Sequence, residues 1–261
     1  MAHVRDSART YSKSDPIDAL AVARAAQREA DLPVARLDGP ERELRLLVDH
    51  RESLVAERTR AICRLRWHLH ELDPGWEPKA RSLDAQRTLD EVQRRLDDQS
   101  GLVARLAREL TSRCAELTVS IKSLEVEIAD LARQLAPTLL AIPGCGTLTA
   151  AKILGETAGV ERFKSRDAYA RHNGTAPLPV WSSNKARHRL SRTGNRQLNA
   201  ALHRIALPQA RWHPPAQAMI QRRRSEGNSG REAMRILKRR LSDAVFQAFR
   251  TDQLEQLSPA T

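Results

Sequence analysis

The 261-residue sequence predicts a mainly α-helical protein. Apolar residues recur every three or four positions through most of the chain, which is the spacing of one helix face. Clusters of proline and glycine divide these runs, and no segment shows the sustained alternation of a half-buried β-strand. We therefore expect helices almost throughout, in a chain long enough for one large core or two smaller ones.

The first helix is predicted to begin at Asp15. Asp15 suits the N-cap, Pro16 the first helical position and Asp18 the third. Two interpretations of the aspartates stay open. Either they cap the helix and interact with its dipole, or both carboxylates reach one divalent cation, because residues at i and i+3 share a face.

Two long amphipathic segments follow. Heptad-spaced apolar residues predict a helix from Glu41 to Leu72, about 48 Å long at 1.5 Å per residue. They predict a second run from Leu89 to Leu135, with a break at Ser100-Gly101. Such helices form a coiled coil, either by folding back on each other or by pairing with a second chain.

A glycine-rich turn starts the C-terminal part of the chain. Pro143-Gly144-Cys145-Gly146 lies between two short apolar segments, the pattern of a helix-hairpin-helix. Gly144 and Gly146 permit a tight turn, and the following helix offers free N–H groups to a phosphate. An ordinary pair of packed helices is the alternative.

The stretch from Ala176 to Ala206 combines two serines with many basic residues. Ser182 and Ser183 lie in a polar turn, and an apolar run from Leu198 predicts the next helix. Guanidinium groups keep their charge at neutral pH, so hydroxyls among them suit a site that binds or attacks a phosphate. From composition alone, a solvated basic turn is the simpler interpretation. The basic residues are Lys185, Arg187, Arg189, Arg192 and Arg196.

The charge distribution points to nucleic acid. The net charge is +12, and residues 161–250 hold 20 basic and 5 acidic residues. Such a region favours a polyanionic partner. Aromatic residues are 3% of the chain, which favours contacts to backbone phosphates over stacking on single-stranded bases.

Other classes of protein fit poorly. Cys63, Cys114 and Cys145 are scattered, so they form neither a disulfide framework nor a metal-ligand cluster. No apolar run approaches the roughly 18 residues of a membrane span, and a signal-peptide pattern is absent. We expect a cytoplasmic protein without a membrane partner.

Three stretches together resemble a known family. They are KSDPIDALAVARAA, IPGCGTLTAAKILGE and ARHNGTAPLPVWSSNKARHRLSRTGNRQLNAALHRIA. They are similar to the DEDD-type insertion-sequence transposases, the family numbered one hundred and ten and related to the recombinase Piv. The resemblance runs from His3 to Asp252. It implies a C-terminal remnant of a RuvC-like (RNase H-like) domain at 1–37, a coiled-coil region at 38–136, a transposase domain with a catalytic serine at 137–252 and a tail at 253–261.

The resemblance also implies a chemistry. Members bind Mg²⁺ or another divalent metal through Asp, Glu, Asp and Asp, and they cut and rejoin DNA through a serine–phosphate linkage. The D-x-x-D motif falls on Asp15 and Asp18, which would be catalytic metal ligands. The serine falls on Ser182, with Ser183 in place of the family's glycine. The implied partners are transposon and target DNA, a guide RNA called a bridge RNA and further copies in a dimer or tetramer, associated with the bacterial nucleoid.

One departure from the family concerns the metal site. The family's first Asp and Glu lie on strands upstream of the D-x-x-D helix, and here fourteen residues precede Asp15. We therefore expect an N-terminally truncated member that binds metal weakly and does not cleave DNA by itself. The alternative is a non-catalytic coiled-coil remnant that binds nucleic acid.

Overall fold

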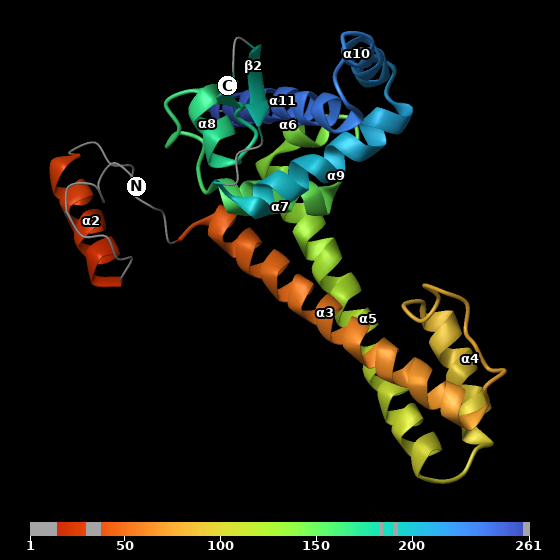
Figure 1. Ribbon diagram of the computed structural model, residues 1–261. Coiled ribbons are helices and arrows are strands. Elements are labelled where there is room, and N and C mark those ends of the chain that lie inside the picture. The colour runs from red at the N-terminus through yellow and green to blue at the C-terminus, as the bar shows by residue number, and fades with distance from the viewer. Residues whose placement is uncertain (1–14, 30–37, 183–184, 190–192, 258–261) are drawn as a thin grey trace. The chain divides into compact units, whose positions relative to one another are not determined.

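The computed structural model describes residues 15–29, 38–182, 185–189 and 193–257 (Figure 1). The chain divides into two units, Met1–Arg36 and Leu37–Thr261, and each is described by itself. Helices dominate the described residues, as the sequence predicts. Among them, no helix is both long and apolar enough to cross a membrane.

In the first unit, the described residues form helix α2, Asp15–Arg28. Asp15 and Asp18 lie in its first turn and Arg28 in its last, so each charge lies at the end that the helix dipole favours. The predicted start of this helix is confirmed to within one residue, because Asp15 is the first helical residue rather than the N-cap. The RuvC-like origin of the segment stays a prediction.

An arm of three helices begins the second unit: α3, Pro40–Leu72, α4, Gln86–Asp97, and α5, Leu102–Leu135. α3 and α5 lie side by side and run in opposite directions (Figure 1). Each is about 50 Å long at 1.5 Å per residue. The predicted helix end at Leu72 and the break at Ser100-Gly101 are confirmed.

Apolar side chains hold the far end of the arm together, and charged pairs cross its flanks. Leu65 and Leu69 of α3 are buried against Leu89 and Leu96 of α4 and against α5. Between α3 and α5, the Arg113 guanidinium donates to Glu57 Oε1 at 2.7 Å, and Arg51 pairs with Glu125. The two long helices thus fold back on each other within one chain. Pairing with a second chain stays a prediction.

The C-terminal helices pack around a second core, which also includes the base of the arm. Tyr169 is fully buried, with its ring centroid 5.8 Å from that of Phe246. Leu44 and Val48 of α3 and Ile128 of α5 belong to the same cluster. The arm is therefore continuous with the bundle. The bundle helices are α6, Pro137–Leu140, α7, Thr147–Thr157, α8, Arg166–His172, α9, Arg196–Trp212, α10, Pro214–Ser225, and α11, Gly230–Leu257.

The expectation of helices almost throughout misses one β-hairpin. Strands β1, Leu178–Ser182, and β2, Lys185–Arg189, pair antiparallel, with Leu178 opposite Arg189. β1 reads Leu-Pro-Val-Trp-Ser, so apolar and polar residues do not alternate along it. β2 reads Lys-Ala-Arg-His-Arg, so its sequence contains no apolar row that would mark a buried face.

Candidate functional site

The hairpin carries the predicted nucleophile and part of the predicted basic cluster. Ser182 is the last residue of β1, and its partner in the register is Lys185, the first residue of β2. Lys185, Arg187 and Arg189 occupy alternate positions of β2. Ser183 and Arg192 lie outside the described residues. The structure therefore brings Ser182 and three predicted phosphate-binding residues into one element.

The base of the hairpin is closed by a main-chain contact. The N–H of Asn195 donates to the carbonyl oxygen of His172 at 2.6 Å, joining the start of α9 to the end of α8. Gly194 has φ +108°, and a Cβ there would lie 2.7 Å from the same carbonyl oxygen. Only glycine fits this position without strain. The segment 173–194 therefore leaves and re-enters the bundle at one point.

Asn173 fixes one side of this base. It is completely buried, and its Nδ2 donates to Ser242 Oγ of α11 at 2.8 Å. Its Oδ1 accepts from the hydroxyl and the N–H of Thr175, and its carbonyl oxygen accepts from Asn199 Nδ2 of α9. A buried amide with its groups paired specifies one arrangement of the chain.

Asn195 fixes the other side and connects it to the arm. Its Oδ1 caps α9 by accepting from the N–H groups of Gln197 and Leu198, while its Nδ2 donates to Glu156 Oε2 at 2.6 Å. Glu156 is 7% exposed and pairs with the 4% exposed Lys152 on the next turn of α7.

Lys152 continues this network onto α3. Its Nζ lies 3.0 Å from both Asp49 Oδ1 and Glu52 Oε2. Burial lowers the pKa of Lys152, but the hydrogen bonds and charges of Glu52 and Asp49 outweigh burial and raise it above its usual value. Lys152 therefore stays charged. A chain of polar contacts runs from α3 through α7 to the hairpin base.

Two histidines near the hairpin base are held neutral. Burial and then the charge of Arg162 lower the pKa of His172 below 6.5. Burial and then the charge of Lys238 likewise lower the pKa of His203 on α9. Lys238 itself donates to Asn199, and burial lowers its pKa. At pH 7 both imidazoles are therefore uncharged.

The network around Asn173, Asn195 and Glu156 was missed by sequence reasoning. The sequence does contain a signal on each side of the hairpin. An Asn-Gly dipeptide, Asn173-Gly174, precedes the hairpin, and a Gly-Asn dipeptide, Gly194-Asn195, follows it. Each was interpretable as a local turn or cap. Their joint role depends on contacts to α7, α9 and α11, which lie far away in the sequence.

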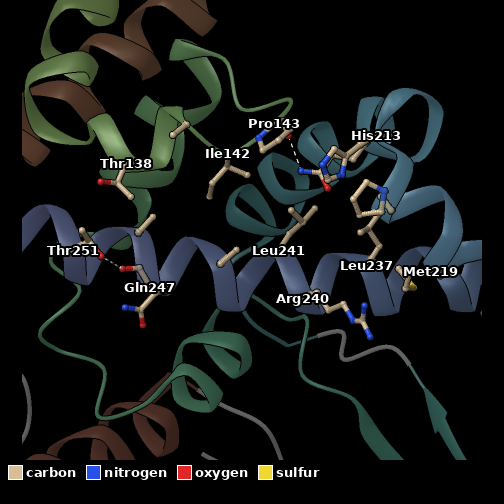
Figure 2. Close-up of a pocket in the computed structure, with 16 residues that line it drawn as sticks. Thr138, Ile142, Pro143, His213, Met219, Leu237, Arg240, Leu241, Gln247 and Thr251 are labelled. Carbon is tan, nitrogen blue, oxygen red and sulfur yellow. Dashed lines mark hydrogen bonds between the residues drawn. The ribbon is translucent and has the colours of Figure 1, made fainter.

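The predicted phosphate-binding glycines lie in the loop before α7. Gly144 has φ +82°, and a Cβ there would meet Pro208 Cγ at 3.0 Å and Ile205 O at 3.3 Å. Gln209 Nε2 donates to the carbonyl oxygen of Pro143 at 2.7 Å (Figure 2). Gly144 therefore lets the loop pack closely on α9. Gly146 is exposed at the N-cap of α7, and its phosphate contact stays a prediction.

An open groove of about 560 Å³ lies between this loop, the α9–α10 corner and α11 (Figure 2). Ile142, Met219, Leu237 and Leu241 line it, and Figure 2 shows Ile142 and Leu241 on facing sides. Phosphate sites consist of cationic and N–H groups. The apolar groove is therefore a feature separate from the basic hairpin.

The predicted metal ligands lie in the first unit. Asp15 is exposed and Asp18 half-buried, one helical turn apart on α2. Carboxylate oxygens are suitable ligands for a hard divalent cation, so the two residues fit part of a ligand set. Within the described ranges, no group of three or more His, Cys, Asp or Glu side chains converges on a common point.

Two family models match the chain. The model described as the transposase IS116/IS110/IS902 family matches residues 136–221, which include the β-hairpin and α9. A second transposase model, for the DEDD type of the IS110 family, matches residues 1–74, which include Asp15 and Asp18. Together they cover more than half of the sequence. The chain belongs to the IS116/IS110/IS902 family of transposases.

Relatives of this family member come from insertion elements of three bacteria. The 42 kDa protein of insertion element IS900 from Mycobacterium paratuberculosis is 27% identical over 295 residues, covering 95% of this chain and 74% of that protein. The 43.6 kDa protein of insertion element IS110 from Streptomyces coelicolor is 26% identical over 300 residues, covering 96% and 74%. The 44.8 kDa protein of IS116 from Streptomyces clavuligerus is 26% identical over 296 residues.

Proposed function

We propose that this transposase cuts and rejoins DNA through a covalent linkage to Ser182. The observation that carries the proposal is the position of Ser182 on a fixed-base hairpin, next to Lys185 in register, within the family-matched part of the chain. Arg187, Arg189, Arg192 and Arg196 follow it in the sequence. Cationic side chains at this density suit the phosphates that flank a cleaved bond.

The proposed step is a transesterification. Ser182 Oγ gives its proton to a base and attacks phosphorus, the bond from phosphorus to the leaving strand oxygen breaks, and that oxygen takes up a proton. The resulting serine–phosphate diester conserves the bond energy of the cleaved DNA phosphodiester for rejoining. Attack by a hydroxyl of a second DNA strand reverses the step and returns the proton to Ser182.

Asp15 and Asp18 would hold a divalent cation, with Mg²⁺ as the proposed ion. When bound, such a cation can activate a hydroxyl group and stabilise charge on a phosphoryl group. Two carboxylates are few for an ion that takes six or more oxygen ligands. We therefore expect weak metal binding by the chain alone and no cleavage of ordinary phosphodiesters by it.

The proposed partners are transposon and target DNA and a guide RNA, bound mainly through their backbones. The exposed N-terminus of α7 at Gly146 would add main-chain N–H groups to a phosphate site, as in a helix-hairpin-helix. The arm of α3 and α5 would serve further copies of the chain as a coiled-coil contact. The second candidate function is nucleic-acid binding without catalysis. It would require the basic surface but neither the serine nor the metal ligands.

Salt dependence tests the phosphate contacts of the hairpin. Replacing both Arg187 and Arg189 with glutamine is expected to reduce the slope of log affinity against log salt by about two, because each phosphate contact releases about one counterion. The measurement is fluorescence anisotropy of a labelled duplex at several salt concentrations. The double variant Arg105→Gln/Arg133→Gln is the charge-matched control, since Arg105 pairs with Glu109 and Arg133 pairs with Asp130 on α5. An equal change in the control and in the hairpin variant contradicts the assignment.

A further inference from the structure

The exposed face of α9 carries a row of basic residues that starts at the hairpin base. Arg196, Arg204 and Arg211 are all exposed. At 100° per residue they lie within about 80° of one another around the helix, opposite the buried Leu202 and Ile205. Their spacing along the axis is about 10 to 12 Å at 1.5 Å per residue.

The charges in this row are available to a ligand. None of the three arginines forms an ion pair with a described residue, whereas Arg222 and Arg223 of α10 both pair with Glu226. His203 lies on the same face, and burial together with the charge of Lys238 lowers its pKa, so it is neutral at pH 7. The row is therefore a line of permanent guanidinium charges.

An exposed tryptophan ends α9, about 100° around the helix from Arg211. Trp212, the last residue of α9, is 80% exposed, more than any other large apolar side chain whose exposure the structure describes. Leaving an indole in water forgoes the free energy of burying it. An aromatic ring beside arginines is the arrangement that stacks on an unpaired base while the cations contact its backbone.

We propose that α9 binds one nucleic-acid strand, with phosphates on Arg196, Arg204 and Arg211 along this face and with an unpaired base stacked on Trp212 where the strand passes the C-terminal end of the helix. The inference rests on the proposed function and adds a property of the substrate. The bound nucleic acid is single-stranded at a distance of about 25 Å from the hairpin base, the length of the seventeen-residue helix. Although aromatic residues are only 3% of the chain, Trp212 thus provides one specific position for stacking a base.

The test compares probes of equal length on the full chain. Labelled single-stranded DNA, single-stranded RNA, blunt duplex DNA and duplex DNA with a single-stranded overhang are titrated by anisotropy. Trp212→Ala is expected to lower affinity for the overhang probe and for at least one single-stranded probe by roughly fivefold to a hundredfold, the range of one base stack. Affinity for the blunt duplex stays within twofold. The larger loss, on DNA or on RNA, identifies which strand α9 receives.

Controls separate stacking from folding and from general binding. Trp212→Phe keeps an aromatic ring and is expected to retain most of the affinity. Trp67→Ala removes an indole that is 69% exposed on α3 and is expected to change none of the four affinities. Equal losses on all probes, or no loss on the single-stranded and overhang probes, overturn the inference while leaving DNA binding intact. A wild-type chain that binds none of the probes overturns the proposed function as well.

Discussion

At the scale of the residue, a few buried polar groups anchor the chain on both sides of the Ser182 hairpin. Asn173 and Asn195 hold its two ends through contacts to α7, α9 and α11. Asn195 caps α9 with its Oδ1, and its Nδ2 donates a hydrogen bond to the buried carboxylate of Glu156. Loss of either asparagine leaves buried partners unpaired, which costs more than the hydrogen bond itself.

Gly194→Ala is the sharpest test of the closed base. The φ of +108° and the 2.7 Å approach to His172 O leave no room for a Cβ, so we expect a loss of about 1 to 3 kcal/mol in the free energy of unfolding. Gly146→Ala is the matched control, because no atom lies within 4 Å of its added Cβ. Urea denaturation measures both. Equal stabilities of the two variants would show that the base is not closed as described.

His172 predicts a pH dependence of stability. Its pKa is lower in the folded chain than the usual 6.5, mainly because of burial and then because of Arg162. As the pH falls through 6.5, the unfolded chain takes up a proton first, so this contribution to stability is complete above 6.5 and is lost below it. We expect His172→Gln to show a smaller loss of unfolding free energy between pH 7.5 and 5.5 than the wild type. An identical loss in both proteins refutes the assignment.

At the scale of the element, the sequence predicted helices well and the hairpin not at all. The ends of α3 and the break before α5 follow from heptad spacing and from Pro-Gly and Ser-Gly signals, which are local. The hairpin of β1 and β2 is short and basic, and its ends are positioned by distant helices. Local periodicity therefore had no means of detecting it. The same holds for the packing of Gly144 on α9.

Leu69→Ala tests the packing of the arm as an element. Leu69 is fully buried among residues of α3, α4 and α5, so its truncation is expected to cost about 2 to 5 kcal/mol in unfolding free energy. Trp67→Ala, two positions earlier and largely exposed, is expected to change it by about 0.5 kcal/mol or less. Thermal and urea unfolding compare them. Similar costs for both would mean that the arm is not packed along this face.

At the scale of the whole molecule, the comparisons confirm membership of a transposase family, and charge and fold are consistent with it. Basic residues concentrate in residues 161–250, where the hairpin, α9 and α11 lie. The arm and the bundle share the core around Leu44 and Ile128. The sequence motifs singled out Ser182 as a candidate, while the contacts that anchor the chain on both sides of its hairpin became evident only from the structure. The roles of Ser182, Asp15 and Asp18 remain proposals.

The covalent role of Ser182 is tested most directly by an adduct to DNA with an activated leaving group. DNA from the ends of the insertion element, with sulfur in place of the leaving oxygen, needs no proton on that atom and little help from a metal. With Mn²⁺ and this DNA, the wild type and Ser183→Ala are expected to form an adduct stable to denaturation, and Ser182→Ala none. Ordinary DNA with Mg²⁺ is expected to give none with the wild type. An adduct that persists in Ser182→Ala, or no adduct in the wild type on the activated DNA, would contradict the account.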